Sequence, residues 1–350
     1  MTMAGQTELP FDVAGLRALP YSLDATGAPA DAASSCAALV EQLKSCVGRE
    51  LVDSPIYQLV DGMEPPPIDP ERTDIFRERM AGFEAIKSRL AAARAEKTAE
   101  SIEAVEKSLG DVSELQANVD IDLLLAYRDV KANKKMIEIV RAMDGRLSQT
   151  VGVRQLLAFA QNRDGQSREA EQTCKEIIAE SGPSSETNGL LGRVYKDRWK
   201  KAVEADDSFA ARGHLKQAIQ AYLTGLEADW RDAYPGVNAV TLMEIADDPR
   251  RHALLPVVRY AVERRLIHPA HANYWDHASR VELAVLADDA DAAYDALSGA
   301  LSVPYENWQL ETTAENLRSI VKARASRNGN TADASRVLEE LTKHVPVEKK

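Results

Sequence analysis

Three histidines that lie close together in the sequence are the first candidates for metal chemistry. His268, His271 and His277 follow one another with Asp276 and Glu282 nearby. Zinc ligands on one helix are expected four residues apart, as in the H-E-x-x-H pattern. A proline between the first two histidines interrupts any such helix. We therefore interpret these histidines as polar residues at helix ends, predict no metal and no cofactor, and keep a metal-dependent hydrolase as an alternative.

Other motifs that would indicate catalysis are weak or missing. Gly189 and Gly192, followed by Lys196, superficially resemble a phosphate-binding loop, but the G-x-x-x-x-G-K-[ST] pattern is not complete. The segment also lies inside a predicted helix, where no backbone N–H is free to bind a phosphate. The sequence has no C-x-x-C, and its odd number of cysteines argues against a disulfide framework: Cys36, Cys46 and Cys174. We predict that the protein is not an enzyme.

A repeat of helical hairpins organises these residues. Leu191, Gly192 and Tyr195 match the L-G-x-x-Y pattern of the first helix of a tetratricopeptide repeat, and Ala218 and Tyr222 match the A-x-x-x-F pattern of its second helix. Steps of 34 residues towards the N-terminus reach further members of the pattern at Leu157, Leu123 and Tyr127. The sequence therefore predicts an all-α, tetratricopeptide-like α-solenoid of stacked antiparallel helix pairs.

Composition changes along the chain indicate the boundaries. Residues 1–30 contain short apolar pieces cut by proline and predict an extended segment with no strand to pair with. Residues 31–60 predict an N-terminal helix, residues 61–70 a proline-rich linker, and residues 71–344 the tetratricopeptide-like array. About 14 extra residues between the two helices of the third pair predict an inserted loop over residues 201–213.

The repeat spacing also predicts a binding groove. Side chains one turn beyond the Leu-Gly pair should point into the concave side of the stack, and the turn before them should form its floor. The resulting groove has an apolar floor and a basic or amide rim, which suits an extended peptide or helix that carries carboxylates. The predicted partner-binding residues are Arg128, Phe159, Asn162, Arg193 and Lys196. The alternative is that they are ordinary solvated polar residues or form ion pairs with the acidic insertion.

Charge and composition limit the partners. The 350 residues are 45% hydrophobic and 5% aromatic, which favours helix over sheet, and 43 basic against 55 acidic residues give a net charge of -12. Basic and acidic residues alternate, without a segregated basic patch, so we predict no binding to nucleic acid or membranes. The sequence shows no secretory signal and no apolar stretch of membrane-spanning length. We expect a soluble cytoplasmic protein.

A family resemblance rests on the central motif. The run from Leu191 to Asp197, a long insertion after it, and Gly236-Val237-Asn238 resemble the TRAFs-binding domain. This domain is the central tetratricopeptide-like helical region of apoptosis signal-regulating kinases and also occurs in bacterial proteins. The resemblance covers roughly Asp53 to Arg324. It implies a stack of helix pairs that scaffolds signalling partners without catalytic activity of its own.

The N-terminal segment carries a second, shorter resemblance. Leu9-Pro10-Phe11 and Leu19-Pro20-Tyr21 are similar to the tail of an α/β domain, Toll/interleukin-receptor-like or deoxyribosyltransferase-like, that precedes this region in bacterial relatives. We interpret residues 1–30 as a remnant of such a domain, which the chain has shed or whose start was misplaced.

These observations favour a non-catalytic scaffold or regulatory module. Its groove would bind a protein partner, in bacterial signalling or conflict response, and the chain could assemble as a homo-oligomer. The first alternative is a small-anion or nucleotide sensor that uses Arg193 and Lys196. The metal-dependent hydrolase described above is the less favoured one.

Overall fold

The structure is a computed structural model that describes residues 2–4, 19–24, 29–46, 70–267 and 272–345. It divides into two compact units, residues 1–81 and residues 82–350, and each is described by itself. Within the described residues, no helix combines the length and the apolar character that crossing a membrane requires.

The N-terminal unit contains two short strands and a helix. β1 (Thr2–Ala4) pairs in parallel with β2 (Leu19–Tyr21), and α1 (Ala32–Cys46) follows. A carboxylate oxygen of Asp31 accepts a hydrogen bond from the backbone N–H of Ser34 and thus satisfies a free donor at the start of α1. The prediction of extended segments without a pairing strand is therefore wrong for β2, because it is paired with β1. Residues 47–69, which include most of the predicted proline-rich linker, lie outside the described residues.

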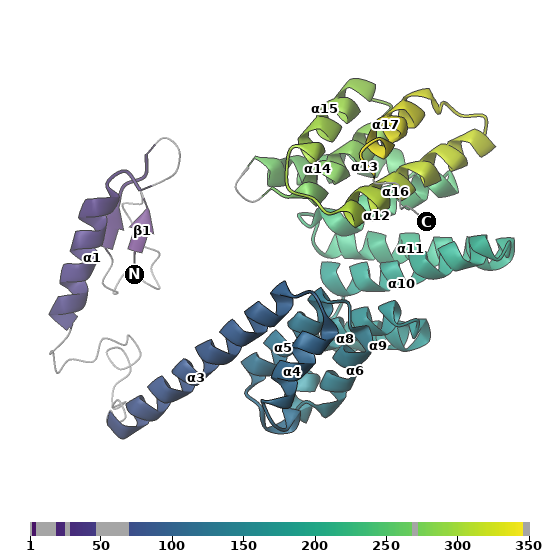
Figure 1. Ribbon diagram of the computed structural model, residues 1–350. Coiled ribbons are helices and arrows are strands. Elements are labelled where there is room, and N and C mark those ends of the chain that lie inside the picture. The colour runs from purple at the N-terminus through teal and green to yellow at the C-terminus, as the bar shows by residue number, and fades with distance from the viewer. Residues whose placement is uncertain (1, 5–18, 25–28, 47–69, 268–271, 346–350) are drawn as a thin grey trace. The chain divides into compact units, whose positions relative to one another are not determined.

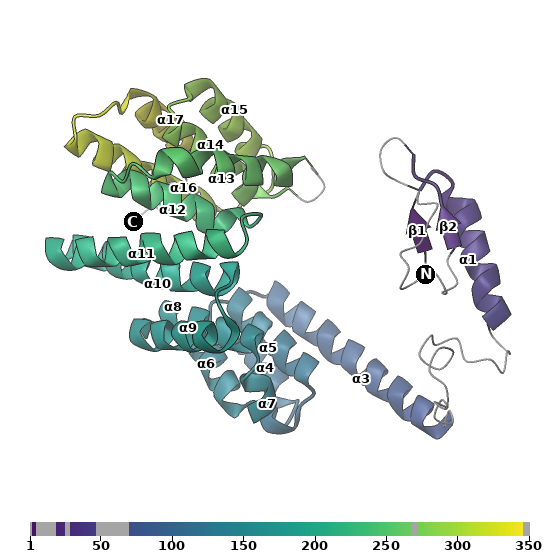
Figure 2. The ribbon, with the colours of Figure 1, turned by 180° about the vertical axis from the view of Figure 1, so that it is seen from behind.

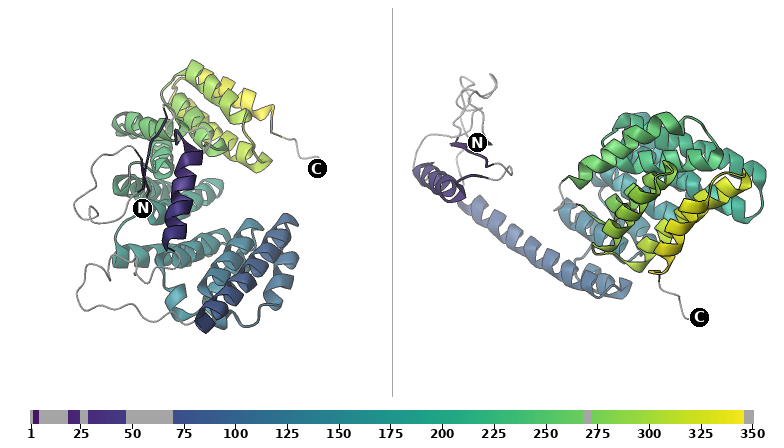
Figure 3. Two further views of the ribbon diagram at one scale, coloured as in Figure 1. Left: turned by 90° about the vertical axis from the view of Figure 1, so that its left-hand side faces the viewer. Right: turned by 90° about the horizontal axis from the view of Figure 1, so that it is seen from above.

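α3 (Pro70–Ala95) begins with a proline, which has no N–H to leave unsatisfied at a helix start, and leads into the second unit. The second unit is a row of antiparallel helix pairs (Figure 1). α4 to α9 lie at one end of this row and α14 to α17 at the other (Figure 2 and Figure 3). The prediction of an all-α, tetratricopeptide-like solenoid is confirmed. The helices after α3 are α4 (Ala99–Lys107), α5 (Ala117–Asp129), α6 (Asn133–Ala142), α7 (Gly145–Ser148), α8 (Val151–Arg163), α9 (Ser167–Ser181), α10 (Ser185–Glu204), α11 (Ser208–Ala228), α12 (Ala233–Ala246), α13 (Arg251–Leu266), α14 (Tyr274–Leu286), α15 (Ala290–Leu301), α16 (Asn307–Ser326) and α17 (Ala332–Thr342), with a short 3₁₀ turn at Val112–Glu114.

The motif residues pack where the repeat pattern places them. Leu191, Tyr195, Ala218 and Tyr222 are buried in one core cluster between the two helices of the central pair, α10 and α11. A Cβ on Gly192 would lie 2.7 Å from the ring of Tyr222, so only glycine allows this approach of the two helices. The L-G-x-x-Y and A-x-x-x-F patterns therefore describe one packed contact.

The repeat length is not constant along the array. The first helix of each pair ends just before a residue with a left-handed backbone, which turns the chain into the second helix. These residues are Lys131, Gly165, Asp206, Asp247, Asp288 and Asn328. The first two are 34 residues apart, whereas Asp206 follows Gly165 by 41 residues and Asp247 follows Asp206 by 41. Seven additional residues make about two helical turns, so the longer helices keep the same buried face.

The predicted inserted loop is helical in the structure. α10 has 20 residues where α8 has 13, and α11 has 21 where α9 has 15, so the additional residues lengthen both helices of the central pair. Only the turn at residues 205–207 separates them. The expectation of a loop over residues 201–213 is therefore wrong. The added turns make α10 and α11 run past the end of α8 and α9 (Figure 1).

Candidate functional site

Lys196 lies inside the array and not on an open groove. Its side chain is in the middle of α10 and the residue is only 5% exposed. The amine donates hydrogen bonds to Asn238 Oδ1 on α12 at 2.9 Å and to Asn316 Oδ1 on α16 at 3.4 Å. Burial lowers the pKa of Lys196 to about 8, against the attraction of Glu282, which raises it. Lys196 is therefore an interior charge, held between α10, α12 and α16.

The helix that covers Lys196 belongs to the last pair of the array. α16 packs against α12 and α14, and an ion pair of 2.8 Å between Lys200 and Glu315 joins α10 to α16. Glu282 on α14 accepts hydrogen bonds from Thr241 and from Asn316, the latter at 3.0 Å. The 34-residue spacing did not reveal this cover, because it describes neighbouring repeats and not contacts between α10 and a helix more than 100 residues later.

Asn162 and Arg193, both predicted to line the groove, are joined through Asp197. Asn162 Nδ2 donates to Asp197 Oδ2 at 2.8 Å, and Arg193 Nε donates to Asp197 Oδ1 at 2.8 Å. They come from α8 and α10, so Asp197 joins the first helices of two neighbouring pairs. Arg193 and Asp197 are four residues apart on one helix, where side chains of opposite charge reach each other.

Phe159 lies beside Arg163, which the repeat spacing did not predict as a groove residue. The guanidinium carbon of Arg163 is 5.5 Å from the centroid of the Phe159 ring, a cation–π contact one turn along α8. No carboxylate in the described part of the chain pairs with Arg163. Partial burial and then the charge of Arg193 lower the pKa of Arg163. Its position four residues after Phe159 was the available signal, since this spacing brings two side chains together on a helix.

We call Phe159, Asn162, Arg163, Arg193 and Asp197 the inner cluster. It holds two guanidinium groups and one carboxylate, and that carboxylate already accepts from both Arg193 and Asn162. The cluster therefore carries a local excess of one positive charge next to a half-buried aromatic ring, on a chain whose net charge is -12. Such an arrangement attracts a carboxylate that arrives with an apolar side chain.

Arg128 does not join the inner cluster. It is exposed near the end of α5 and forms an ion pair with the adjacent Asp129 at 3.6 Å. Asp129 also pairs with Arg94 of α3 at 3.7 Å. Three of the predicted groove residues therefore lie in different environments: Arg128 is exposed, Asn162 belongs to the inner cluster, and Lys196 is an interior charge.

The histidines are not gathered into a metal site in the described part of the chain. His268 and His271 lie outside the described residues. His277 on α14 packs against Gly299 of α15, where an added Cβ would be 2.7 Å from its Nδ1. Asp276 is held by Arg265 at 2.6 Å, and no group of three or more His, Cys, Asp or Glu in this part is arranged to hold a metal ion.

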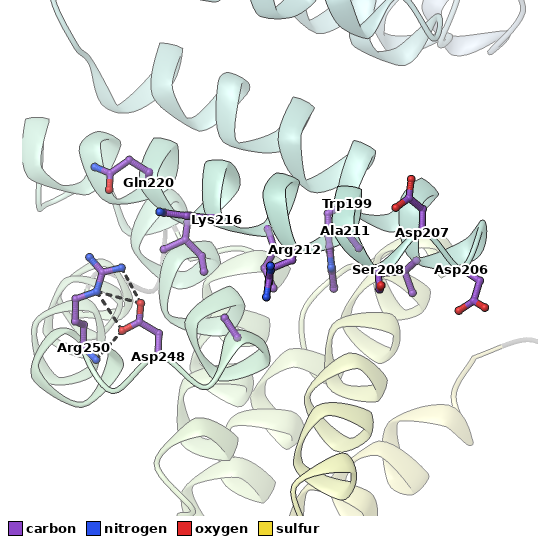
Figure 4. A pocket seen from close by; sticks show the side chains of 14 residues that line it. Trp199, Asp206, Asp207, Ser208, Ala211, Arg212, Lys216, Gln220, Asp248 and Arg250 are labelled. Atoms are coloured by element: carbon purple, nitrogen blue, oxygen red, sulfur yellow. Dashed lines mark hydrogen bonds and ion pairs between the residues drawn. The ribbon is translucent and has the colours of Figure 1, made fainter.

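A large cavity lies on the lengthened hairpin and is not lined by the inner cluster. It has a volume of about 760 Å³ and is lined by α10 and α11, with the end of α12 and the start of α13 closing one side (Figure 4). Trp199 and Val203 come from α10, and Leu215 and Ile219 from α11. The charged side chains at its edge include Arg212 and Lys216. We call this cavity the hairpin pocket.

The solved structures to which this chain is similar include helical repeat proteins of low sequence identity. TTC0263, a tetratricopeptide repeat protein of Thermus thermophilus, is 15% identical, with 58% of this chain and 99% of that chain covered and a TM-score of 0.44. A human IFIT1 dimer with PPP-AAAA is 11% identical, with 74% of this chain and 64% of that chain covered and a TM-score of 0.44.

Sequence comparison finds kinase relatives and a family. The kinase nsy-1 of Caenorhabditis elegans, a mitogen-activated protein kinase kinase kinase, is 26% identical over 225 residues, which are 58% of this chain and 15% of the relative. Mouse mitogen-activated protein kinase kinase kinase 15 is 23% identical over 223 residues, 60% of this chain and 16% of the relative. Each match thus spans less than one fifth of the relative. Residues 6–339 match the MAP3K TRAFs-binding domain, and this range includes most of the N-terminal segment. The chain therefore belongs to the MAP3K TRAFs-binding domain family.

Proposed function

We propose that this chain is a non-catalytic protein-interaction module that binds an acidic segment of a signalling partner at the inner cluster. The tetratricopeptide-like fold and the family membership support a protein-interaction role. The observation that carries the choice of surface is the charge of the inner cluster, where Arg193 is paired with Asp197 and Arg163 has no carboxylate partner in the described part of the chain. Asn162 belongs to this surface in the proposal, Arg128 lies outside the cluster, and Lys196 contributes through packing alone.

The electrostatics of the cluster support an acidic ligand. The two guanidinium groups repel each other, and the pKa of Arg163 is lowered by its partial burial and by Arg193. A carboxylate placed between them would relieve this repulsion and could accept two hydrogen bonds from the planar fork of Arg163. Phe159 supplies apolar surface for the neighbouring side chain of the partner, and aromatic and arginine residues contribute much of the binding energy at protein interfaces.

The test is charge reversal at Arg163. Arg163→Glu removes a cation that has no carboxylate partner in the described residues, so it should leave the fold intact. A partner is first isolated and identified with the wild-type chain, and its affinity for both proteins is then measured by calorimetry. We expect binding to weaken by about tenfold or more, the effect of a lost charge-assisted contact plus a new repulsion.

Arg168→Glu is the matched control, because Arg168 is exposed on α9, is not a member of the inner cluster, and pairs with no carboxylate in the part of the chain that the structure describes. An identified partner that binds Arg163→Glu as tightly as wild type would refute the inner cluster as the site. A rise in the melting temperature with ATP or inorganic phosphate, in wild type but not in Arg163→Glu, would instead favour the small-anion sensor, because only binding to the native state stabilises it.

A further inference from the structure

The hairpin pocket has a lining that the proposed function does not use. The added turns of α10 and α11 extend past α8 and α9, and these turns, with the α12–α13 corner, enclose the cavity of about 760 Å³. Trp199, Val203, Leu215 and Ile219 give it an apolar wall. Val203 is 43% exposed and Phe209, at the start of α11, is 82% exposed. A lengthened hairpin that leaves such side chains in water indicates an interaction surface.

α11 presents two parallel rows to the pocket. One row is apolar and consists of Ala211, Leu215 and Ile219. The other is polar and consists of Arg212, Lys216 and Gln220. Members of each row are four residues apart, so each row follows one face of the helix. The two rows together match an amphipathic helix laid along α11 with its apolar side on the first row.

The cations of the polar row are available to a partner. Within the described residues, neither Arg212 nor Lys216 pairs with a carboxylate, and Arg212 only covers the Phe209 ring at 5.8 Å. Two cations of α10 outside the polar row are paired with carboxylates, Arg198 with Glu171 and Lys200 with Glu315. The unpaired charges lie on the rim of an apolar cavity, where a partner's carboxylates would lose less hydration than they would in the interior.

The charged residues at the two ends of the pocket determine where the carboxylates of a bound segment can lie. Asp206 and Asp207 line the pocket at the hairpin turn, where Asp207 already accepts from the backbone N–H of Ala210. At the opposite end, Arg250 and Asp248 neutralise each other at 2.7 Å (Figure 4). The positive rim is therefore the stretch beside Lys216 and Arg212, and the negative end lies at the turn.

We propose that the hairpin pocket binds an amphipathic helix of a partner protein, with a row of apolar side chains against Leu215 and Ile219 and a row of carboxylates four residues apart against Arg212 and Lys216. This site is separate from the inner cluster. The pocket and the partner helix would be complementary. The pocket has unpaired cations and an apolar wall, and the partner helix has carboxylates and apolar side chains.

The experiment uses the full chain and a designed probe. A fluorescein-labelled peptide of about 18 residues carries leucines on one helical face and glutamates four residues apart on the flank, and a second peptide has glutamine at the glutamate positions. Binding is followed by fluorescence anisotropy with wild type, with Arg212→Glu/Lys216→Glu, and with the neutral variant Arg212→Gln/Lys216→Gln. The matched control is Arg168→Glu/Lys201→Glu, which reverses two exposed charges that do not line the pocket and that form no ion pair within the described residues.

We expect the glutamate peptide to bind wild type at least about tenfold more tightly than the glutamine peptide, and the double reversal in the pocket to remove this preference. Arg168→Glu/Lys201→Glu and Arg163→Glu should bind it like wild type, which separates this proposal from the inner cluster. If the double reversal fails to fold, the neutral variant Arg212→Gln/Lys216→Gln tests the same expectation, which is the loss of the preference for the glutamate peptide. The proposal is overturned if the two peptides bind equally or not at all, if the pocket variants bind like wild type, or if sedimentation shows that wild type dimerises through this face and the variants do not.

Discussion

Lys196 provides a sharp test of the fold, because a buried amine leaves a signature in the pH dependence of stability. Burial lowers the pKa of Lys196 from 10.5 to about 8 in the folded chain. Between these two values the unfolded chain binds a proton that the folded chain does not. Stability therefore rises with pH in this window. A difference of two to three pH units corresponds to about 3 kcal/mol.

The perturbation is Lys196→Met, which removes the amine and retains most of the side-chain volume. Urea unfolding of wild type and variant is measured from pH 8 to pH 10.5, and the two free energies of unfolding are subtracted at each pH. We expect the difference, wild type minus variant, to increase by about 3 kcal/mol over this range. Lys201→Met, on the exposed side of the same helix, is the control for the loss of one lysine.

A difference that stays flat or falls with increasing pH would refute the reasoning. The amine would then be hydrated in solution, which means that α16 does not cover α10 as the contacts to Asn316 and Glu315 indicate. The subtraction removes the contributions of other titrating groups, since they are the same in both proteins. The result would also decide whether Lys196 can contact a ligand, as the sequence predicted.

Two further substitutions test the packing of the array by chemical denaturation. Gly192→Ala places a methyl group 2.7 Å from the buried Tyr222 ring and should lower the free energy of unfolding by roughly 1–3 kcal/mol. The control is Gly152→Ala, which has nothing within 4 Å of the added methyl group and should leave the free energy of unfolding unchanged or raise it. Equal effects of the two substitutions would show that α10 and α11 do not approach so closely. Asp120→Asn should raise the free energy of unfolding at pH 7 by roughly 1–2 kcal/mol, because burial raises the pKa of Asp120 to about 6 and the stabilising protonated form is lost as the pH rises through that value. This gain should disappear near pH 3.8, and a gain of the same size at both pH values would contradict the pKa argument.

The fold was predictable from the sequence because its signal is local. Leu191, Gly192 and Tyr195 on one helix and Ala218 and Tyr222 on the next are fixed by the spacing at which two adjacent helices touch. This contact needs residues only about 30 positions apart, and the periodicity of a helix records it directly. The family resemblance rested on the same segment, and the match over residues 6–339 confirmed it.

Tertiary structure decided which of the predicted groove residues reach solvent. Nothing around Lys196 in the sequence indicates that Asn316, on a helix 120 positions later, would cover it. The sequence showed the insertion as additional length between two predicted helices. In the structure these residues extend both helices, α10 and α11, which line the hairpin pocket. Repeat spacing records contacts between neighbouring pairs, whereas the burial of a charge depends on the superhelical path of the whole array. The local pattern of the sequence is therefore enough to predict the helix pairs, whereas the path of the array determines which of their polar side chains are exposed.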